Sequence, residues 1–209
     1  MLIVGTEVGP MTTTILLIRH AEHVDLGRRL SGRREGVALS ENGCLQARAL
    51  GARLAGHGLA RVEHSPLQRT RETAAAIAQG CALPAPTPVD ALLEIDFGEW
   101  TGRAFDSFGE DPAWRAWNAY RSTARVSGGE SMVEAQARIV DHIHAAAARA
   151  EGETVAMVSH ADMIRAAVAH VLGLPLDHML RFDIDPASVT GVAIGSWGAK
   201  LLFLNWKGD

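Results

Sequence analysis

The segment Ile15-Leu16-Leu17-Ile18-Arg19-His20 places two basic residues directly after four consecutive apolar ones. A short apolar run of this length is typical of a strand that is buried on both faces of a parallel sheet. Ligands of such sheets bind beyond the carboxyl ends of the strands, where Arg19 and His20 follow. The segment therefore predicts a central strand and one side of a binding site.

Two further segments repeat this order. Residues 60–64 lead into Ser65-Pro66, and Thr154–Val158 lead into Ser159-His160. The stretch Ser65–Gln68 has the pattern of a capping box with proline at the first helical position, and Ser159 is expected to cap the next helix more weakly. The repeated pattern predicts an α/β fold, a three-layer α/β/α sandwich with a mostly parallel central sheet.

Other segments predict the helices and the hairpin that complete this fold. Ser40 and Ser131 are plausible N-caps of two amphipathic helices, and residues 111–120 form a tryptophan-bearing helix candidate. The alternating apolar residues between 189 and 204 flank Gly195–Gly198, which predicts a closing β-hairpin.

The composition of the 209 residues excludes several classes of protein. A formal net charge of −4 gives no general attraction to nucleic acid or to an anionic membrane, so neither is expected as a partner. Two cysteines are too few for a disulfide framework, and no apolar run is long enough to span a bilayer. We expect a cytoplasmic protein with a single domain over residues 12–209 and an N-terminal extension over residues 1–11. The oligomeric state is left open, with a homodimer as one possibility.

Basic residues follow all three predicted strands. Arg19 and His20 follow the first, and His160 follows the third. Arg69 lies one turn into the helix after the second strand, where side chains lean back towards the strand ends, whereas Arg71 lies about 200° further round the helix. Guanidinium groups and helix N-termini both suit phosphate oxygens, so the pattern predicts a phosphoryl site that needs no metal.

Six blocks of sequence follow one another along the chain: Leu17–His20, Leu39–Gly43 with Gln46-Ala47, Ser65–Arg69, Leu93–Gly102, Gly128–Ser131 and Val158–His160. Together they resemble the motifs of the histidine phosphatase, or phosphoglycerate mutase-like, superfamily. The resemblance extends from Thr14 to about Asn205.

This resemblance implies a role for each residue of the basic cluster. His20 would attack phosphorus and become phosphohistidine, while Arg19, Arg69 and His160 would hold the transferring group. Glu94 would protonate the leaving oxygen and then, as a carboxylate, activate the water that hydrolyses the intermediate. The implied activity is that of a phosphatase acting on a small phosphorylated metabolite without a cofactor, with His20, Glu94 and His160 as its catalytic residues.

Three positions depart from the family pattern. Ala21 replaces the usual glycine, Leu26 stands where a phosphate-contacting asparagine is common, and Ala161-Asp162 replaces a Gly-Gly or Gly-Asp pair. The core chemistry is expected to survive, but the substrate contacts stay open. The candidates to replace the asparagine are His23, Arg28, Arg29, Arg33 and Arg34.

Several single residues also have alternative interpretations. Asp96 and Glu99 compete with Glu94 for the role of the acid. Asp162 is expected to lie at a helix end rather than to act as a second acid. Gly128-Gly129 are expected to serve the geometry of a loop near the site.

Three other functions compete with the phosphatase hypothesis. A phosphomutase would use the same phosphohistidine, but mutases of the glycolytic type are usually longer, whereas the segment Phe105–Arg125 is short and tryptophan-rich. A metal-dependent hydrolase would use some of the residues His20, His23, Glu94, His160 and Asp162 as ligands. A non-catalytic module that binds phosphorylated ligands would need the basic pocket but no general acid.

Overall fold

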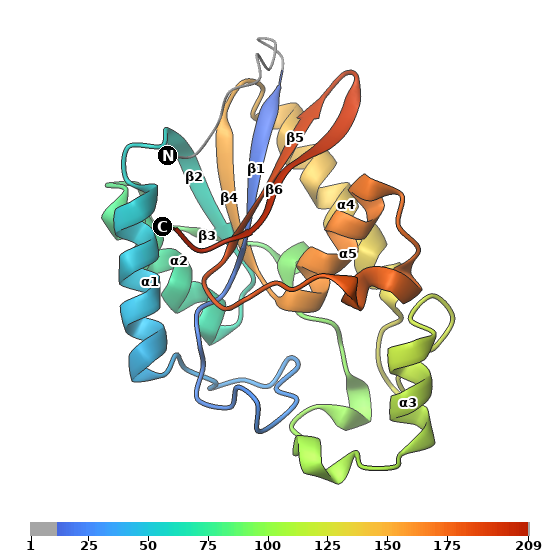
Figure 1. Cartoon of the computed structure of the whole chain (residues 1–209). Coiled ribbons are helices and arrows are strands. Elements are labelled where there is room, and N and C mark those ends of the chain that lie inside the picture. Colours follow the sequence, from blue (N-terminus) through green and yellow to red (C-terminus); the bar gives the residue numbers. More distant parts are fainter. Residues whose placement is uncertain (1–11, 209) are drawn as a thin grey trace.

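The computed structural model describes residues 12–208, in which helices cover both faces of a six-stranded sheet (Figure 1). The strands are β1 (Thr13–Arg19), β2 (Leu59–His64), β3 (Thr87–Pro88), β4 (Thr154–Ser159), β5 (Val189–Gly195) and β6 (Gly198–Trp206). The α-helices are α1 (Glu41–Leu54), α2 (Gln68–Gly80), α3 (Pro112–Ala119), α4 (Met132–Arg149) and α5 (Ala161–Leu172). Short 3-10 helices are η1 (Asp90–Leu92), η2 (Gly98–Trp100), η3 (Phe105–Ser107) and η4 (Leu176–Arg181). The expected extension, residues 1–11, lies outside the described residues.

The strand order is β3-β2-β4-β1-β5-β6. The first four strands run parallel, whereas β5 pairs antiparallel with both β1 and β6. The prediction of a mostly parallel sheet is therefore confirmed. The predicted hairpin is also confirmed, with its turn between Gly195 and Gly198.

Strand β1 is apolar on both faces, and its two sets of side chains belong to two separate cores. Ile15 and Leu17 pack in the core that includes buried residues of α4 and α5. Leu16 and Ile18 pack in the core that includes buried residues of α1 and α2. Because successive residues of a strand point to opposite faces, this division produces the predicted three layers, and Figure 1 shows the two helix pairs on either side of the sheet. None of the helices described in residues 12–208 combines the length and hydropathy needed to traverse a bilayer.

The register of the parallel strands brings the predicted site residues together. Arg19 is paired with Ser159, and His64 is paired with Val158. Beyond the last pairs, the backbone N–H of His20 donates to the Ser159 carbonyl (3.0 Å). The ends of β1, β2 and β4 therefore lie at one edge of the sheet, as required for a common site.

The helix starts confirm two of the predicted caps and correct two others. Ser40 accepts a hydrogen bond from Gly43 N–H, and Ser131 forms a complete capping box with Glu134. The predicted caps Ser65 and Ser159 are wrong, since α2 begins at Gln68 and α5 at Ala161 without a side-chain cap. Both hydroxyls are fully buried and have tertiary partners instead, His160 for Ser65 and the Leu92 carbonyl for Ser159.

Candidate active site

A cavity of about 180 Å³ lies beyond the carboxyl end of β1. Arg19, His20, Arg69 and Glu94 all line it, although they come from three separate segments. His160 lies behind this wall, fully buried, with its ring centroid 5.2 Å from that of His20. The structure thus brings together all five residues predicted for the site. The remaining lining residues are His23, Leu26, Gly27, Arg29, Leu30, Ser31, Gly32, Phe97, Phe105, Ala161 and Asp162.

The ring of His20 is held in one tautomer. Its Nδ1 lies 2.8 Å from the carbonyl oxygen of Ala21, which can only accept, so Nδ1 carries the proton and Nε2 keeps its lone pair. Burial, followed by the charges of Arg69 and Arg19, holds the pKa of His20 well below its ordinary value of 6.5. The ring is therefore neutral at neutral pH, which is the state that a nucleophilic nitrogen requires.

The two arginines present unpartnered donors. Arg69 is fully buried and donates from one terminal nitrogen to the Gly32 carbonyl (2.7 Å), while its Nε and its other terminal nitrogen have no partner. Arg19 donates to the Ile184 carbonyl (2.7 Å) and also leaves a buried Nε without a partner. Buried donors without partners are costly, so their retention around a cavity indicates an anion site. Arg71 lines a different cavity, as its helical position predicted.

His160 has a partner on each ring nitrogen. Its Nδ1 lies 3.2 Å from the Arg69 guanidinium and 3.9 Å from Glu94, and its Nε2 lies 2.9 Å from the Ser65 hydroxyl. A guanidinium can only donate, so Nδ1 accepts and Nε2–H donates to Ser65. Sequence reasoning missed this role of Ser65, because its position before Pro66 is equally typical of a helix cap.

Of the three candidate acids, only Glu94 lines the cavity. Its side chain is 15% exposed, and burial, reinforced by the charge of Asp162, raises its pKa to about 7. A carboxyl group with this pKa can both donate and accept a proton near neutral pH. Asp96 instead caps Gly98 N–H, and Glu99 is exposed.

The backbone of Glu94 is fixed by two arginines. Its carbonyl accepts hydrogen bonds from Arg33 (2.8 Å) and Arg138 (3.1 Å). Both arginines are paired with the carboxylate of Glu130, whose oxygens lie 3.1 Å and 2.7 Å from them. Sequence reasoning missed this network, because the block Gly128–Ser131 gave Glu130 no role of its own and Arg138 resembles an ordinary polar residue of a helix.

Two glycines let the loop after Glu94 pack against the 127–130 loop. A Cβ on Gly98 would lie 2.2 Å from the Ser127 carbonyl oxygen, and one on Gly129 would lie 2.3 Å from that of Asp96. Such distances exclude any side chain at these positions. The predicted role of Gly128-Gly129 in loop geometry is confirmed, with Gly128 at a φ of +65°.

The structure distinguishes the candidates that could replace the family's phosphate-contacting asparagine, whose place Leu26 takes in this chain. Leu26 itself lines the cavity, together with His23 and Arg29. Arg33 is bound to the Glu94 carbonyl and Arg34 to Asp25 (3.2 Å). Ala21, in turn, has no left-handed φ, so its position does not require the usual glycine.

Asp162 lies in the first turn of α5, as predicted, and also lines the cavity. Its two oxygens accept hydrogen bonds from Arg121 (2.8 Å) and Arg165 (3.1 Å). Arg121 follows α3, is only 4% exposed, and lies over the ring of Trp117 (4.7 Å). Sequence reasoning missed Arg121, whose partner is 41 residues away.

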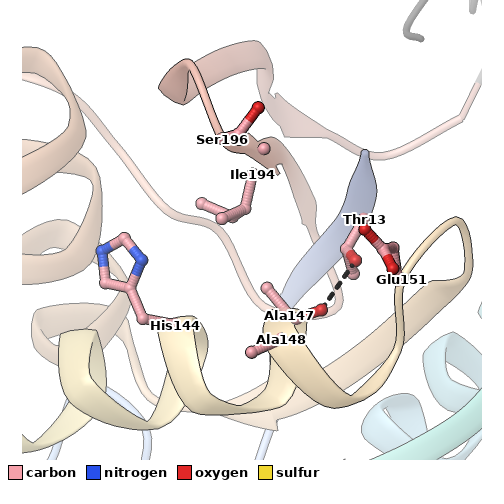
Figure 2. A pocket seen from close by; sticks show the side chains of 8 residues that line it. Thr13, His144, Ala147, Ala148, Glu151, Ile194 and Ser196 are labelled. Carbon is pink, nitrogen blue, oxygen red and sulfur yellow. Dashed lines mark hydrogen bonds between the residues drawn. The ribbon is translucent and has the colours of Figure 1, made fainter. Parts of the chain in front are cut away.

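Two other arrangements in the described part of the chain offer no alternative site. Among residues 12–208, no three histidine, cysteine, aspartate or glutamate side chains are grouped so that they could hold a metal ion, so the metal-site hypothesis finds no ligand set there. A second cavity of about 350 Å³ lies at the opposite end of β1, beside Thr13. Figure 2 shows that its His144 and Glu151 do not converge, so it offers no comparable chemistry.

Comparison with known proteins agrees with this geometry. A sequence model described as histidine phosphatase superfamily (branch 1) matches residues 15–207. The chain belongs to the histidine phosphatase superfamily. The resemblance inferred from the six sequence blocks is thereby confirmed.

The relatives within this superfamily carry more than one name. Phosphoserine phosphatase 1 of Hydrogenobacter thermophilus is 31% identical over 198 residues, covering 91% of each chain. A probable phosphoglycerate mutase of Erwinia tasmaniensis is 32% identical, covering 85% of this chain and 83% of its own. A solved mycobacterial structure, glucosyl-3-phosphoglycerate phosphatase, has a TM-score of 0.82 and 25% identity, covering 93% of this chain and 99% of its own.

Proposed function

We propose that this protein is a phosphatase that hydrolyses a small phosphate monoester through a phosphohistidine intermediate on His20. The observation that carries the proposal is the neutral ring of His20 beside the unpartnered guanidinium donors of Arg69 and Arg19. Fixed cations of this kind stabilise the charge that spreads over the equatorial oxygens during phosphoryl transfer, so the step requires no metal and no cofactor.

In the first step, Nε2 of His20 forms a bond to phosphorus as the ester P–O bond breaks, and Glu94 gives its proton to the leaving oxygen. The remaining Nδ1–H continues to donate to the Ala21 carbonyl (2.8 Å). In the second step, a water oxygen bonds to phosphorus as the N–P bond breaks, and Glu94 takes the water proton. The pKa of Glu94, about 7, supports both uses of its carboxyl group.

In this proposal His160 and Arg69 act as a unit that holds the transferring group. Nδ1 of His160 lies 3.2 Å from the guanidinium of Arg69 and 3.9 Å from the carboxylate of Glu94, and both of these residues line the cavity. To donate to a phosphoryl oxygen, Nδ1 must gain a proton. The Ser65 hydroxyl, 2.9 Å from Nε2, can accept a hydrogen bond from Nε2 while that nitrogen carries a hydrogen, and can donate one to it when it does not.

The substrate is proposed to be a small phosphorylated metabolite, as the names of the phosphoserine and glucosyl-3-phosphoglycerate phosphatases support. The cavity mouth includes Leu26 and Phe105, which give its rim an apolar side. A cytoplasmic location and a homodimer stay predictions. Both cysteines are free, which suits a reducing compartment.

The proposal is tested by turnover of p-nitrophenyl phosphate in the presence of a strong chelator, with trapping of an acid-labile phosphoprotein. Wild type should release phosphate, and His20→Ala should lose activity by roughly three orders of magnitude or more. His144→Ala, an exposed histidine in the other cavity, is the matched control and should behave as wild type. Equal turnover by wild type and His20→Ala would refute the assignment of His20 as the nucleophile.

A phosphomutase is the second candidate, because a relative 32% identical carries the name of a probable phosphoglycerate mutase. A mutase returns the phosphoryl group of His20 to a phosphorylated substrate and therefore needs a phosphorylated primer. Steady phosphate release without a primer supports the phosphatase. Isomerisation of a phosphorylated metabolite only when a primer is added supports the mutase.

A further inference from the structure

His23 belongs to the wall of the cavity but has no part in the mechanism above. It follows His20 by three residues and is only 7% exposed, and its ring centroid lies 5.2 Å from that of His20. Its side chain therefore borders the part of the cavity beside His20, where the transferring phosphoryl group would lie.

A local hydrogen bond determines which nitrogen of His23 carries the proton. The backbone N–H of Asp25 donates to Nδ1 (3.2 Å), so Nδ1 is unprotonated and Nε2 bears the hydrogen. Within residues 12–208, Nε2 has no hydrogen-bond partner from the protein. His23 thus offers the cavity one free N–H donor.

This donor is uncharged. Burial, followed by the charges of Arg69 and Arg19, lowers the pKa of His23 to about 4, although Asp25 and Glu22 oppose this effect. A neutral N–H beside two guanidinium groups adds a hydrogen bond without adding repulsion between cations. Chemically it matches the amide donor of an asparagine.

We propose that His23 donates its Nε2–H to an oxygen of the transferring phosphoryl group, in place of the amide donor that Leu26 cannot supply. This inference rests on the proposed function. The other candidates are already engaged or exposed. Arg33 holds Glu94, and Arg34 holds Asp25. Arg28 is exposed and does not line the cavity, and Arg29 lies at the rim, where it donates to the Gly102 carbonyl (3.1 Å).

Three variants separate donation to phosphate from a role in loop structure. His23→Leu removes both the Nε2 donor and the acceptor for Asp25 N–H. His23→Asn keeps an acceptor for that N–H, because an asparagine oxygen readily accepts from the residue two positions ahead, but its shorter amide does not reach as far as Nε2. His23→Leu combined with Leu26→Asn restores an amide donor from the neighbouring position.

The measurements are kcat/KM for p-nitrophenyl phosphate, the affinity for inorganic phosphate by calorimetry, and the thermal midpoint. His23→Leu and His23→Asn should both lower kcat/KM roughly 10- to 100-fold, as expected for loss of a hydrogen bond to a charged group. Both should also weaken phosphate binding. Adding Leu26→Asn to His23→Leu should recover most of the lost kcat/KM and phosphate affinity. His23→Asn should retain the thermal midpoint better than His23→Leu.

The outcomes that overturn the inference differ from those that overturn the proposed function. If His23→Asn binds phosphate as tightly as wild type, His23 is only a loop residue. The same conclusion follows if the loss of phosphate affinity parallels the fall in thermal midpoint and the added Leu26→Asn restores no affinity. If wild type binds inorganic phosphate but hydrolyses no ester, the phosphatase proposal fails, while the binding measurements still decide the role of His23.

Discussion

The hydroxyl of Ser65 lies 2.9 Å from Nε2 of His160, although the two residues are 95 positions apart. Both are fully buried. This contact fixes the orientation of the second histidine of the site and gives its ring a partner that can either donate or accept.

Replacement of Ser65 by alanine should therefore affect both stability and activity. It leaves a buried N–H of His160 without a partner, at a cost of about 1–3 kcal/mol in the free energy of unfolding. The freed ring should also lower kcat/KM, by roughly 10-fold. Urea denaturation and steady-state kinetics measure the two effects. Ser131→Ala removes the half-buried cap of α4 and is the control, with a comparable loss of stability, about 1 kcal/mol, and unchanged kcat/KM.

Glu94→Gln should lower the turnover of an alkyl phosphate by about 100-fold or more, because the poor leaving group then departs without a proton. The exposed Glu99→Gln should retain wild-type turnover. If Glu99→Gln abolished activity while Glu94→Gln did not, the assignment of the acid would be wrong.

The same Glu94 variant should change the pH dependence of stability. The pKa of Glu94 is raised from 4.5 to about 7 in the folded protein, so ionisation of this carboxyl group costs folding free energy as pH rises above 4.5, and the cost levels off above about 7. The glutamine variant escapes this cost. Its free energy of unfolding relative to wild type should therefore increase between pH 4.5 and pH 8, on the order of 3 kcal/mol. Denaturation at several pH values tests this, and a constant difference would contradict it.

Asp162→Asn should shift the limb of the pH–rate profile that reports Glu94 to lower pH. The negative charge of Asp162 is the second cause, after burial, of the raised pKa of Glu94. Asp177→Asn is the matched control, because Asp177 binds Ser122 and so anchors the same loop that holds Arg121. If this limb of the pH–rate profile shifts in both variants, displacement of the loop explains the shift, and loss of the Asp162 charge does not.

Phe105→Ala should weaken the binding of substrates with a large apolar leaving group. Phe105 lines the cavity mouth and is 37% exposed, so its ring can cover part of such a group. We expect KM for an aryl phosphate to increase several-fold, roughly 1 kcal/mol of lost apolar contact, with unchanged inhibition by inorganic phosphate. Tyr120→Ala, an exposed aromatic residue outside the cavity, should leave both values unchanged.

Much of the fold and of the basic cluster could be predicted from the sequence, because the signals are local. The apolar run in β1 requires burial on both faces, and this requirement alone produces three layers. The choice of Arg69 over Arg71 follows from the geometry of one helical turn, and the structure places Arg69 in the cavity. The capping box at Ser131 was predictable for the same reason, since all its partners lie within four residues.

Tertiary structure decided the features that depend on distant partners and on burial. Ser65 has the sequence pattern of a cap, yet parallel pairing of β2 and β4 places it against His160. The raised pKa of Glu94 and the free donor of His23 exist only because packing removes water and positions charges around them. Local sequence signals thus identify which reactive groups meet at the end of β1, whereas the folded environment sets their protonation states and so the chemistry available to each.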